Sequence, residues 1–395
     1  MGIGVDNSLG NKITKYVLYF LSFFFAFGPI NPFAIGEEEL DESLSPFLTI
    51  FTGLFVLSFF LFQSNLLKHD NKIRNIIIPL IILFLAISLG DITYDINTAH
   101  YYFLLKFSVN IVAFLFLYVY FIHNPEQIEK SLRIFAFSCV LIILMLNIHL
   151  LDNFSNVHNG RLWLFGENPN NTSSRMSMAL LVLFYYATAN KKIVTKSLYY
   201  IICGFIFYYI IQSGSRGSFI ASLLGIGILM FFRERDKNTK IMQIIGLVIC
   251  AMMLFPIIVE NEDIGMFDRM EELREGNSRE QLIMDAIEIA GDYPIVGCGH
   301  HGYAQEKMRR GMDLHDSHNM LASVFVMGGI VGLISLITFL LKLCRISYKS
   351  IKETPLSITL LLSMIFIAMK TGGVLTYMLM WYIYAVTLAM VQLKK

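Results

Sequence analysis

The sequence predicts an all-α protein that crosses a membrane about twelve times. Hydrophobic residues make up 55% of the 395 positions and charged residues only 15%. These proportions are too apolar for a soluble protein of one to three domains. The apolar runs are continuous and about 18 to 25 residues long, which fits spanning helices and not the short alternating strands of a membrane β-barrel.

The distribution of charge predicts which ends of these spans face the cytoplasm. With the N-terminus inside, most of the 31 Lys and Arg fall in inside segments, whereas most of the 30 Asp and Glu fall on the other side. The positive-inside rule then places both termini in the cytoplasm. The first span lacks a small-residue cleavage pattern and is expected to remain as a signal anchor. The expected spans are 13–33, 45–66, 73–90, 101–122, 130–151, 175–189, 197–212, 217–232, 241–259, 319–344, 355–370 and 374–392.

The segment Ser213-Gly214-Ser215-Arg216-Gly217 places an arginine at the boundary between two of these spans. The second span begins on the outer face, so its first N–H groups and its positive dipole end point outward. A guanidinium beside free backbone donors suits phosphoryl oxygens. The alternative is a tight turn whose arginine contacts lipid headgroups. This hinge is therefore predicted to bind an anion.

Two further features lie near the outer face. Arg161 is followed by Trp163, and this arginine is interpreted either as a ligand-binding residue or as an interfacial one. The stretch Asn168-Pro169-Asn170-Asn171 has strong turn chemistry. Near the outer end of the eleventh span, Lys370 is expected to snorkel outward.

The long outer loop, residues 260–317, is expected to fold into a helical cap. Ser278-Arg279-Glu280-Gln281 fits a capping box, and apolar residues then recur at helical spacing. These two features predict an amphipathic helix with Arg279 in its first turn. A cation is unfavourable at a helix N-terminus unless it and the helix end bind the same anion. The alternative is an ion pair with Glu275 or Glu280.

The end of this loop carries a candidate general base. His318 precedes Asn319 at the predicted start of the tenth span, where the helix dipole is expected to lower the pKa of the imidazole and keep it neutral. One alternative is a solvated interfacial histidine. Another is a metal site built from His315, His318 and the acids between them, and no matching ligand cluster stands out elsewhere.

The order of these features resembles the bacterial O-antigen ligase and O-antigen polymerase superfamily. The resemblance covers about Arg161 to Gly332 and includes the Gly-x-x-Asn-Pro-Asn stretch, the Ser-Arg-Gly hinge, the Arg-led helix ending in Pro-x-x-Gly-x-Gly, and the His-Asn pair. It implies a GT-C-like membrane glycosyltransferase that acts on undecaprenyl-diphosphate-linked glycans at the extracytoplasmic face of the bacterial cytoplasmic (inner) membrane.

The resemblance also implies roles for individual residues. Arg216 and Arg279 would handle the donor diphosphate, and His318 would accept the proton of the acceptor hydroxyl. No metal and no cofactor are expected, because arginines can stabilise the departing diphosphate. Direct displacement by the acceptor hydroxyl would invert the anomeric centre. Further substrate-binding residues are expected to be Arg161, Asn170, Gly214, Ser215, Gly217, His315 and Asn319.

The acceptor is left open between two partners. A repeat-unit polymerase would extend one lipid-linked glycan with another, and a ligase would pass the glycan to a lipid A core; the number and diversity of polymerases favour the first. A transporter or flippase of lipid-linked glycans is the alternative from another class, although the candidate polar residues gather at the outer face and not at the midplane. No nucleic-acid partner is expected.

Overall fold

The computed structural model of the protein describes residues 7–27, 46–69, 74–94, 99–158, 161–165, 167–190, 192–233, 241, 278–371 and 374–393. Apart from residue 241, the predicted ninth span lies outside this range. So does the first part of the predicted cap, residues 260–277.

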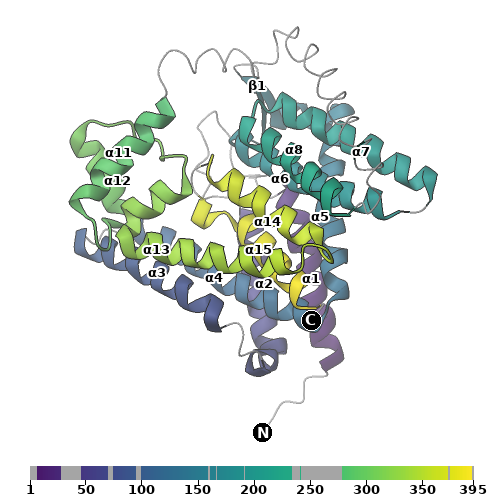
Figure 1. The fold of residues 1–395 in the computed structure, drawn as a ribbon, viewed down its shortest axis with the longest axis horizontal. Coiled ribbons are helices and arrows are strands. Elements are labelled where there is room, and N and C mark those ends of the chain that lie inside the picture. The colour runs from purple at the N-terminus through teal and green to yellow at the C-terminus, as the bar shows by residue number, and fades with distance from the viewer. Residues whose placement is uncertain are drawn as a thin grey trace.

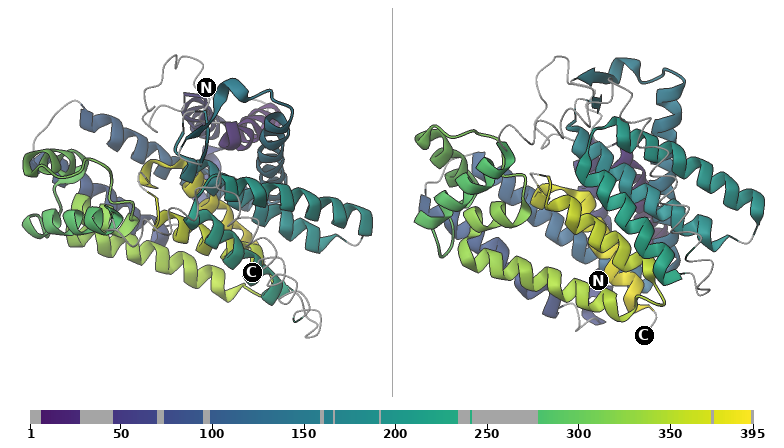
Figure 2. Two further views of the ribbon diagram at one scale, coloured as in Figure 1. Left: turned by 90° about the horizontal axis from the view of Figure 1, so that it is seen from above. Right: turned by 45° about the horizontal axis from the view of Figure 1, so that its top comes forward.

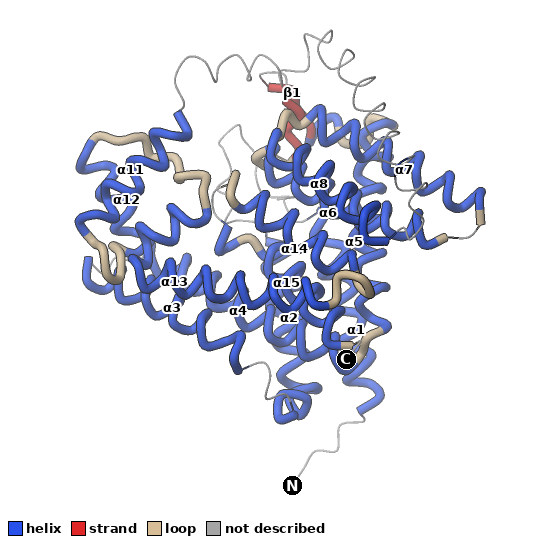
Figure 3. Tube along the Cα trace, viewed as in Figure 1, coloured by secondary structure: helices blue, strands red, loops and turns tan. Residues whose placement is uncertain are grey.

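The described residues form a mainly helical molecule (Figure 1). A short antiparallel hairpin pairs β1 (Ser155–His158) with β2 (Arg161–Leu164) and lies at one edge of the molecule (Figure 3). Short 3-10 helices are η2 (Ser64–His69), η3 (Asp152–Phe154) and η5 (Val374–Thr376). The α-helices are α1 (Asn7–Phe27), α2 (Pro46–Gln63), α3 (Arg74–Tyr94), α4 (Ala99–His123), α5 (Glu126–Asn147), α6 (Pro169–Ala189), α7 (Ile193–Gln212), α8 (Arg216–Arg233), α11 (Ser278–Asp292), α12 (Gly299–Arg310), α13 (Met320–Lys349), α14 (Pro355–Ala368) and α15 (Met378–Gln392).

Each predicted span except the ninth coincides with one of these helices, with ends that differ by several residues. Within the described residues, five helical segments are long and apolar enough to cross a membrane: Phe47–Leu67, Arg74–Tyr94, Tyr102–His123, Ile193–Gln212 and Met320–Lys349. Three shorter helical segments are also apolar: Arg216–Phe232, Pro355–Ala368 and Met378–Gln392. The all-α class predicted from the composition is therefore confirmed.

The candidate spanning helices expose apolar side chains on their outward faces. On α2, for example, Leu57, Phe60 and Leu61 expose 52%, 61% and 60% of their surface. Such faces are unfavourable in water but are stable against lipid tails, which are as apolar as the side chains themselves.

The centre of the molecule is occupied by α14 and α15, which lie among the other helices in both views of Figure 2. Almost all of α15 is buried, including Trp381, whose indole N–H donates to the backbone oxygen of Leu375 at 2.9 Å. The hydroxyl of Tyr382 lies 2.6 Å from that of Ser131 on α5. These bonds satisfy polar groups that would otherwise be costly in an apolar interior.

The turn formed by the Pro-x-x-Gly-x-Gly residues after α11 inserts into a break in α13. Gly329 has φ of 59° and ψ of −162°, which interrupts the helix. The freed backbone groups are satisfied by this turn, because the N–H groups of Ile330 and Val331 donate to the oxygens of Pro294 and Ile295 at 2.9 and 3.2 Å. A Cβ at Gly329 would lie 2.3 Å from the backbone of Ile295, so the close approach requires glycine.

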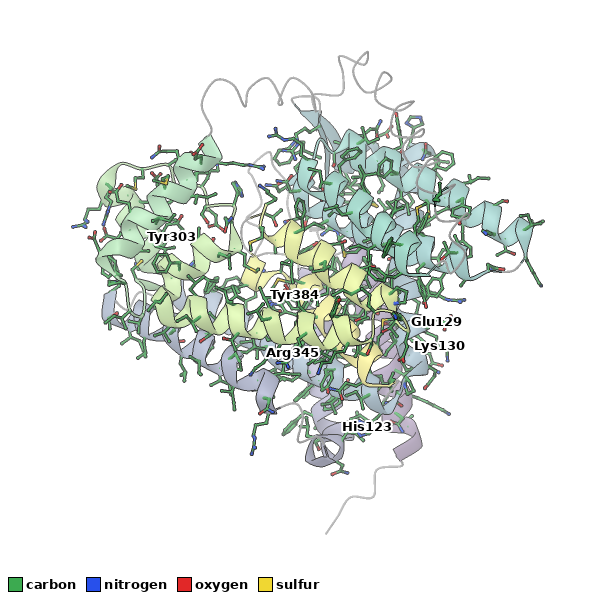
Figure 4. All side chains as sticks on the ribbon, viewed as in Figure 1. His123, Glu129, Lys130, Tyr303, Arg345 and Tyr384 are labelled. Carbon is green, nitrogen blue, oxygen red and sulfur yellow. The ribbon has the colours of Figure 1, made fainter. Side chains whose placement is uncertain are left out.

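Helix α12 is held against the end of α3 by a buried carboxylate. Glu306 accepts hydrogen bonds from the hydroxyls of Tyr94 on α3 and of Tyr293, at 3.0 and 3.1 Å, and pairs with Arg309 and Arg310. These bonds hold α12 beside α11 at one end of α13. Figure 4 shows Tyr303 of α12 at that end and Arg345 of α13 towards the other.

Candidate active site

The predicted hinge is confirmed as a turn between α7 and α8. Gly214 has φ of 62°, a left-handed conformation that favours glycine. Its N–H donates to the oxygen of Ile211 at 2.9 Å, and the N–H of Ser215 lies 3.3 Å from the hydroxyl oxygen of Ser213. Helix α8 then begins at Arg216, so the first N–H groups of this helix are gathered at the hinge.

Arg161 of β2 supports the hinge through hydrogen bonds. Its Nε donates to the oxygen of Ser213 at 2.9 Å, and Nη2 donates to Oδ1 of Asn170 at 3.0 Å. The residue is 7% exposed, so protein contacts surround its side chain. The structure gives Arg161 a supporting position in which it joins β2, α6 and the hinge.

The Asn-Pro-Asn-Asn stretch forms the start of α6. Asn168 is the N-cap and accepts from the N–H of Asn170 at 3.0 Å, and Pro169 occupies the first turn, where its missing N–H has no cost. Glu167 forms a bidentate ion pair with the buried Arg175 one turn further along. The carboxamide of Asn170 is therefore held in a fixed place beside the hinge.

Hydroxyl pairs fix α6 against α8. Ser173 donates to Ser218 at 2.9 Å, and Ser222 donates to Ser177 at the same distance. Small polar residues allow close contact between helices in a membrane and bond across the contact. This packing sets the position of Arg216 relative to Asn170.

A pocket opens at this junction, and we refer to it as the cationic pocket. Among the described residues, three that line it are cationic and none is acidic. The lining is drawn from α6, the hinge, α8, α11 and the end of α14. It consists of Asn170, Gly214, Ser215, Arg216, Gly217, Ser218, Arg279, Ile367, Lys370 and Thr371.

The structure therefore brings together both predicted arginines. Arg279 lies in the first turn of α11, as the capping-box pattern predicted. On this helix Leu282, Ala286 and Ala290 are buried as expected, whereas Ile287 is 44% exposed. Like charges that converge in one pocket are stabilised when an anion binds between them.

His318 lies in a loop just ahead of α13, residues 313–319, which we call the histidine loop. Its φ of 50° is unusual for a residue with a side chain. Nδ1 is buried and has no hydrogen-bond partner among the described residues. Burial lowers the pKa of His318, the positive charge of Arg279 lowers it further, and Asp316 opposes both effects. The lowered pKa agrees with the predicted direction, and burial is its largest cause.

The histidine loop is held by buried polar groups. Lys307 of α12 donates from Nζ to the oxygens of Asp313, at 2.8 Å, and of His315. Burial lowers the pKa of this lysine, while Asp316, Asp285 and Asp313 oppose the shift. Oδ1 of Asp316 accepts from the hydroxyl of Ser323 at 2.9 Å.

Two other predicted residues have structural roles in the same loop. Asn319 caps α13, because its Oδ1 accepts from the N–H groups of Leu321 and Ala322 at 3.0 and 3.1 Å. His315 is exposed and bonds to Asp313 through its ring. No group of three or more His, Cys, Asp or Glu able to hold a metal ion occurs within the described residues.

Sequence reasoning missed two lysines. Lys370, which was expected to snorkel outward, is exposed and also lines the cationic pocket. The signal for this second position was present, since Lys370 is a charge at the outer end of an apolar run, as Arg216 is. Lys307 lies in a polar helix where no pattern distinguishes it. In the fold it contacts the histidine loop, six to eight residues further along the chain.

The arrangement combines a pocket lined by three cationic residues with a half-buried imidazole of lowered pKa, and Arg279 both lines the pocket and lowers that pKa. Such a site can stabilise a departing phosphate group and accept a proton from a hydroxyl.

Comparisons with known proteins agree with this chemistry. No curated protein matches the chain. A protein-family model described as O-antigen ligase (Wzy_C) matches residues 199–337, which include Arg216, Arg279 and His318. This match confirms the resemblance of the chain to the O-antigen ligase and O-antigen polymerase superfamily.

Proposed function

We propose that this protein transfers a glycan from undecaprenyl diphosphate to an acceptor hydroxyl at the extracytoplasmic face of the bacterial inner membrane, and that it acts as a repeat-unit polymerase. The observation that carries the proposal is the cationic pocket, which has no acidic residue among the described residues that line it. The family match supports transfer of a lipid-linked glycan.

The pocket is assigned to the donor diphosphate. Arg216 offers a planar guanidinium beside the first turn of α8, and Arg279 offers a second one from α11. Guanidinium groups and backbone N–H groups can together bind several phosphoryl oxygens. Their charge is most useful as the sugar–phosphate bond breaks, when negative charge grows on the leaving group.

His318 is assigned to the acceptor. Its pKa is lowered, so the imidazole stays neutral near pH 7 and can accept the proton of the attacking hydroxyl. In one displacement the acceptor oxygen bonds to the anomeric carbon, the bond from that carbon to the phosphate oxygen breaks, and undecaprenyl diphosphate departs. Direct displacement inverts the anomeric centre. Charge stabilisation by arginine requires no metal ion.

The cap is assigned to positioning. Helices α11 and α12 carry Arg279 and Lys307, so this part of the outer loop would bring the pocket and the histidine loop together. Both termini would lie in the cytoplasm, and the site would lie on the opposite side.

A transfer assay tests the proposal. Purified protein in lipid nanodiscs is supplied with an undecaprenyl-diphosphate-linked repeat unit, with and without a lipid A core acceptor. A polymerase lengthens the glycan on the lipid alone. Product that forms only with the core would identify a ligase, and the absence of transfer to either acceptor would exclude both functions.

A chelator tests the assignment of charge stabilisation to arginine. Transfer is expected to continue in excess EDTA. Activity that is lost in chelator and restored by a divalent cation would overturn the metal-independent mechanism.

A further inference from the structure

Lys370 adds a third positive charge to the cationic pocket and lies outside the segment matched by the family model. It comes two residues after the end of α14. The N–H of Lys370 donates to the oxygen of Ile367 at 2.8 Å, and the hydroxyl of Thr371 donates to the same oxygen at 2.9 Å. These bonds tie the backbone at this position to the last turn of α14, so the lysine side chain starts from a fixed point.

The stem of Lys370 lies against the first turn of α8. A Cβ built at Gly217 would be 3.1 Å from Cβ and 3.6 Å from Cγ of Lys370, and within the described residues no other atom beyond the adjoining backbone comes within 4 Å. The absence of a side chain at Gly217 thus allows the lysine to pass close to the residue that follows Arg216. The contact joins α14 to the hinge at the pocket.

The charge of the substrate changes during transfer in a way that the pocket can match. The intact donor is a diphosphate diester with two negative charges. When the bond to the sugar breaks, the terminal phosphate gains a further charge, because the last ionisation of a phosphate monoester has a pKa of about 6. Arg216 and Arg279 balance the charge of the donor, and a third cation balances the leaving group.

We propose that Lys370 is a catalytic residue that contacts the departing diphosphate and stabilises its third negative charge. This inference rests on the proposed function. Since the interaction strengthens as the bond breaks, loss of Lys370 should lower kcat more than it raises KM for the donor. A residue with only a structural role would not separate the two constants in this way.

Binding measurements without transfer test the inference. The probes are farnesyl diphosphate, which carries the charge of the leaving group, and farnesyl-diphosphate-linked N-acetylglucosamine, a diester that carries the charge of the donor. Both are titrated at pH 8 into protein in nanodiscs. For Lys370→Gln we expect affinity for farnesyl diphosphate to fall about tenfold or more and affinity for the diester to fall only a few-fold.

Matched variants complete the experiment. Lys370→Arg keeps the charge and should retain most of the affinity, whereas Lys352→Gln, three residues before the opposite end of α14, should bind as the wild type does. If Lys370→Gln binds both probes like the wild type, the role of Lys370 is overturned and the proposed function stands. If the wild type binds neither probe, the donor site itself is overturned.

Discussion

The cationic pocket and the histidine loop are built on opposite principles, although Arg279 influences both. The pocket gathers positive side chains from separate helices, and no carboxylate is among the described residues that line it. The histidine loop mixes signs, because Asp316 and the buried Lys307 hold it by hydrogen bonds. In the proposed function an anion binds in the first region, whereas hydrogen bonds within the protein hold the second.

This difference separates two tasks in the proposed reaction. A pocket with excess positive charge favours a state in which negative charge is present or growing. A loop with balanced charge can keep one imidazole buried and neutral, ready to accept a proton. Changes in the pocket should therefore act on diphosphate binding, and changes in the loop should act on proton transfer with binding intact.

The largest effect is expected for Arg216→Ala. Removal of the guanidinium beside the start of α8 should lower transfer at least about a thousandfold and weaken farnesyl diphosphate binding about a hundredfold. Transfer is measured from the undecaprenyl-linked repeat unit, and binding is measured in nanodiscs. Arg233→Ala, at the other end of α8, is the control. Near-normal turnover of Arg216→Ala would remove the donor site from this pocket.

His318→Ala should show the opposite pattern. Loss of the general base is expected to lower kcat about 100- to 10,000-fold, while the affinity for farnesyl diphosphate stays within twofold of the wild type. His149→Ala is the matched control, because His149 is exposed and pairs only with the surface residue Asp152 in the described structure. If His318→Ala loses binding as strongly as Arg216→Ala does, the two regions do not divide the reaction between them.

The positions of the hinge and of Arg279 could be predicted from local sequence. The hinge follows from glycines between two apolar runs, and the place of Arg279 follows from a capping box ahead of an amphipathic pattern. Both signals act within a few residues along the chain. They therefore predict where a charged side chain begins but not what it contacts.

The contacts that convert these positions into a site connect distant segments. Arg161 bonds to the oxygen of Ser213, 52 residues away, and no periodicity predicts that a backbone oxygen is its partner. The adjacent glycines Gly328 and Gly329 indicate where α13 can break, but they do not indicate that the turn before α12 fills the break. Lys370 reaches the pocket because α14 packs on α8, which the sequence of either helix alone does not specify.

A pH profile tests how closely Arg279 couples the two regions. Its positive charge lowers the pKa of His318, so Arg279→Gln should raise that pKa back towards the ordinary value of 6.5. More of the imidazole is then protonated at a given acidic pH, and the acid limb of kcat should shift to higher pH. Lys130→Gln, on α5, serves as a charge-matched control. An unmoved acid limb would show that Arg279 acts on the pocket alone.

The smallest effect is expected for Gly217→Ala, which tests the contact between α8 and Lys370. Alanine is more favourable than glycine inside a helix by about 0.5 to 1 kcal/mol, so the thermal stability of the protein should hold or rise. The new methyl group would nevertheless lie 3.1 Å from Cβ of Lys370 and would displace the lysine by a few tenths of an ångström. Farnesyl diphosphate affinity should therefore fall about two- to fivefold although the fold is no less stable. Gly227→Ala lies further along the same helix, where no described residue beyond the adjoining backbone comes within 4 Å of the added Cβ, so it should share any gain in stability and keep full affinity. Equal affinities for the two variants would mean that the position of Lys370 does not affect diphosphate binding.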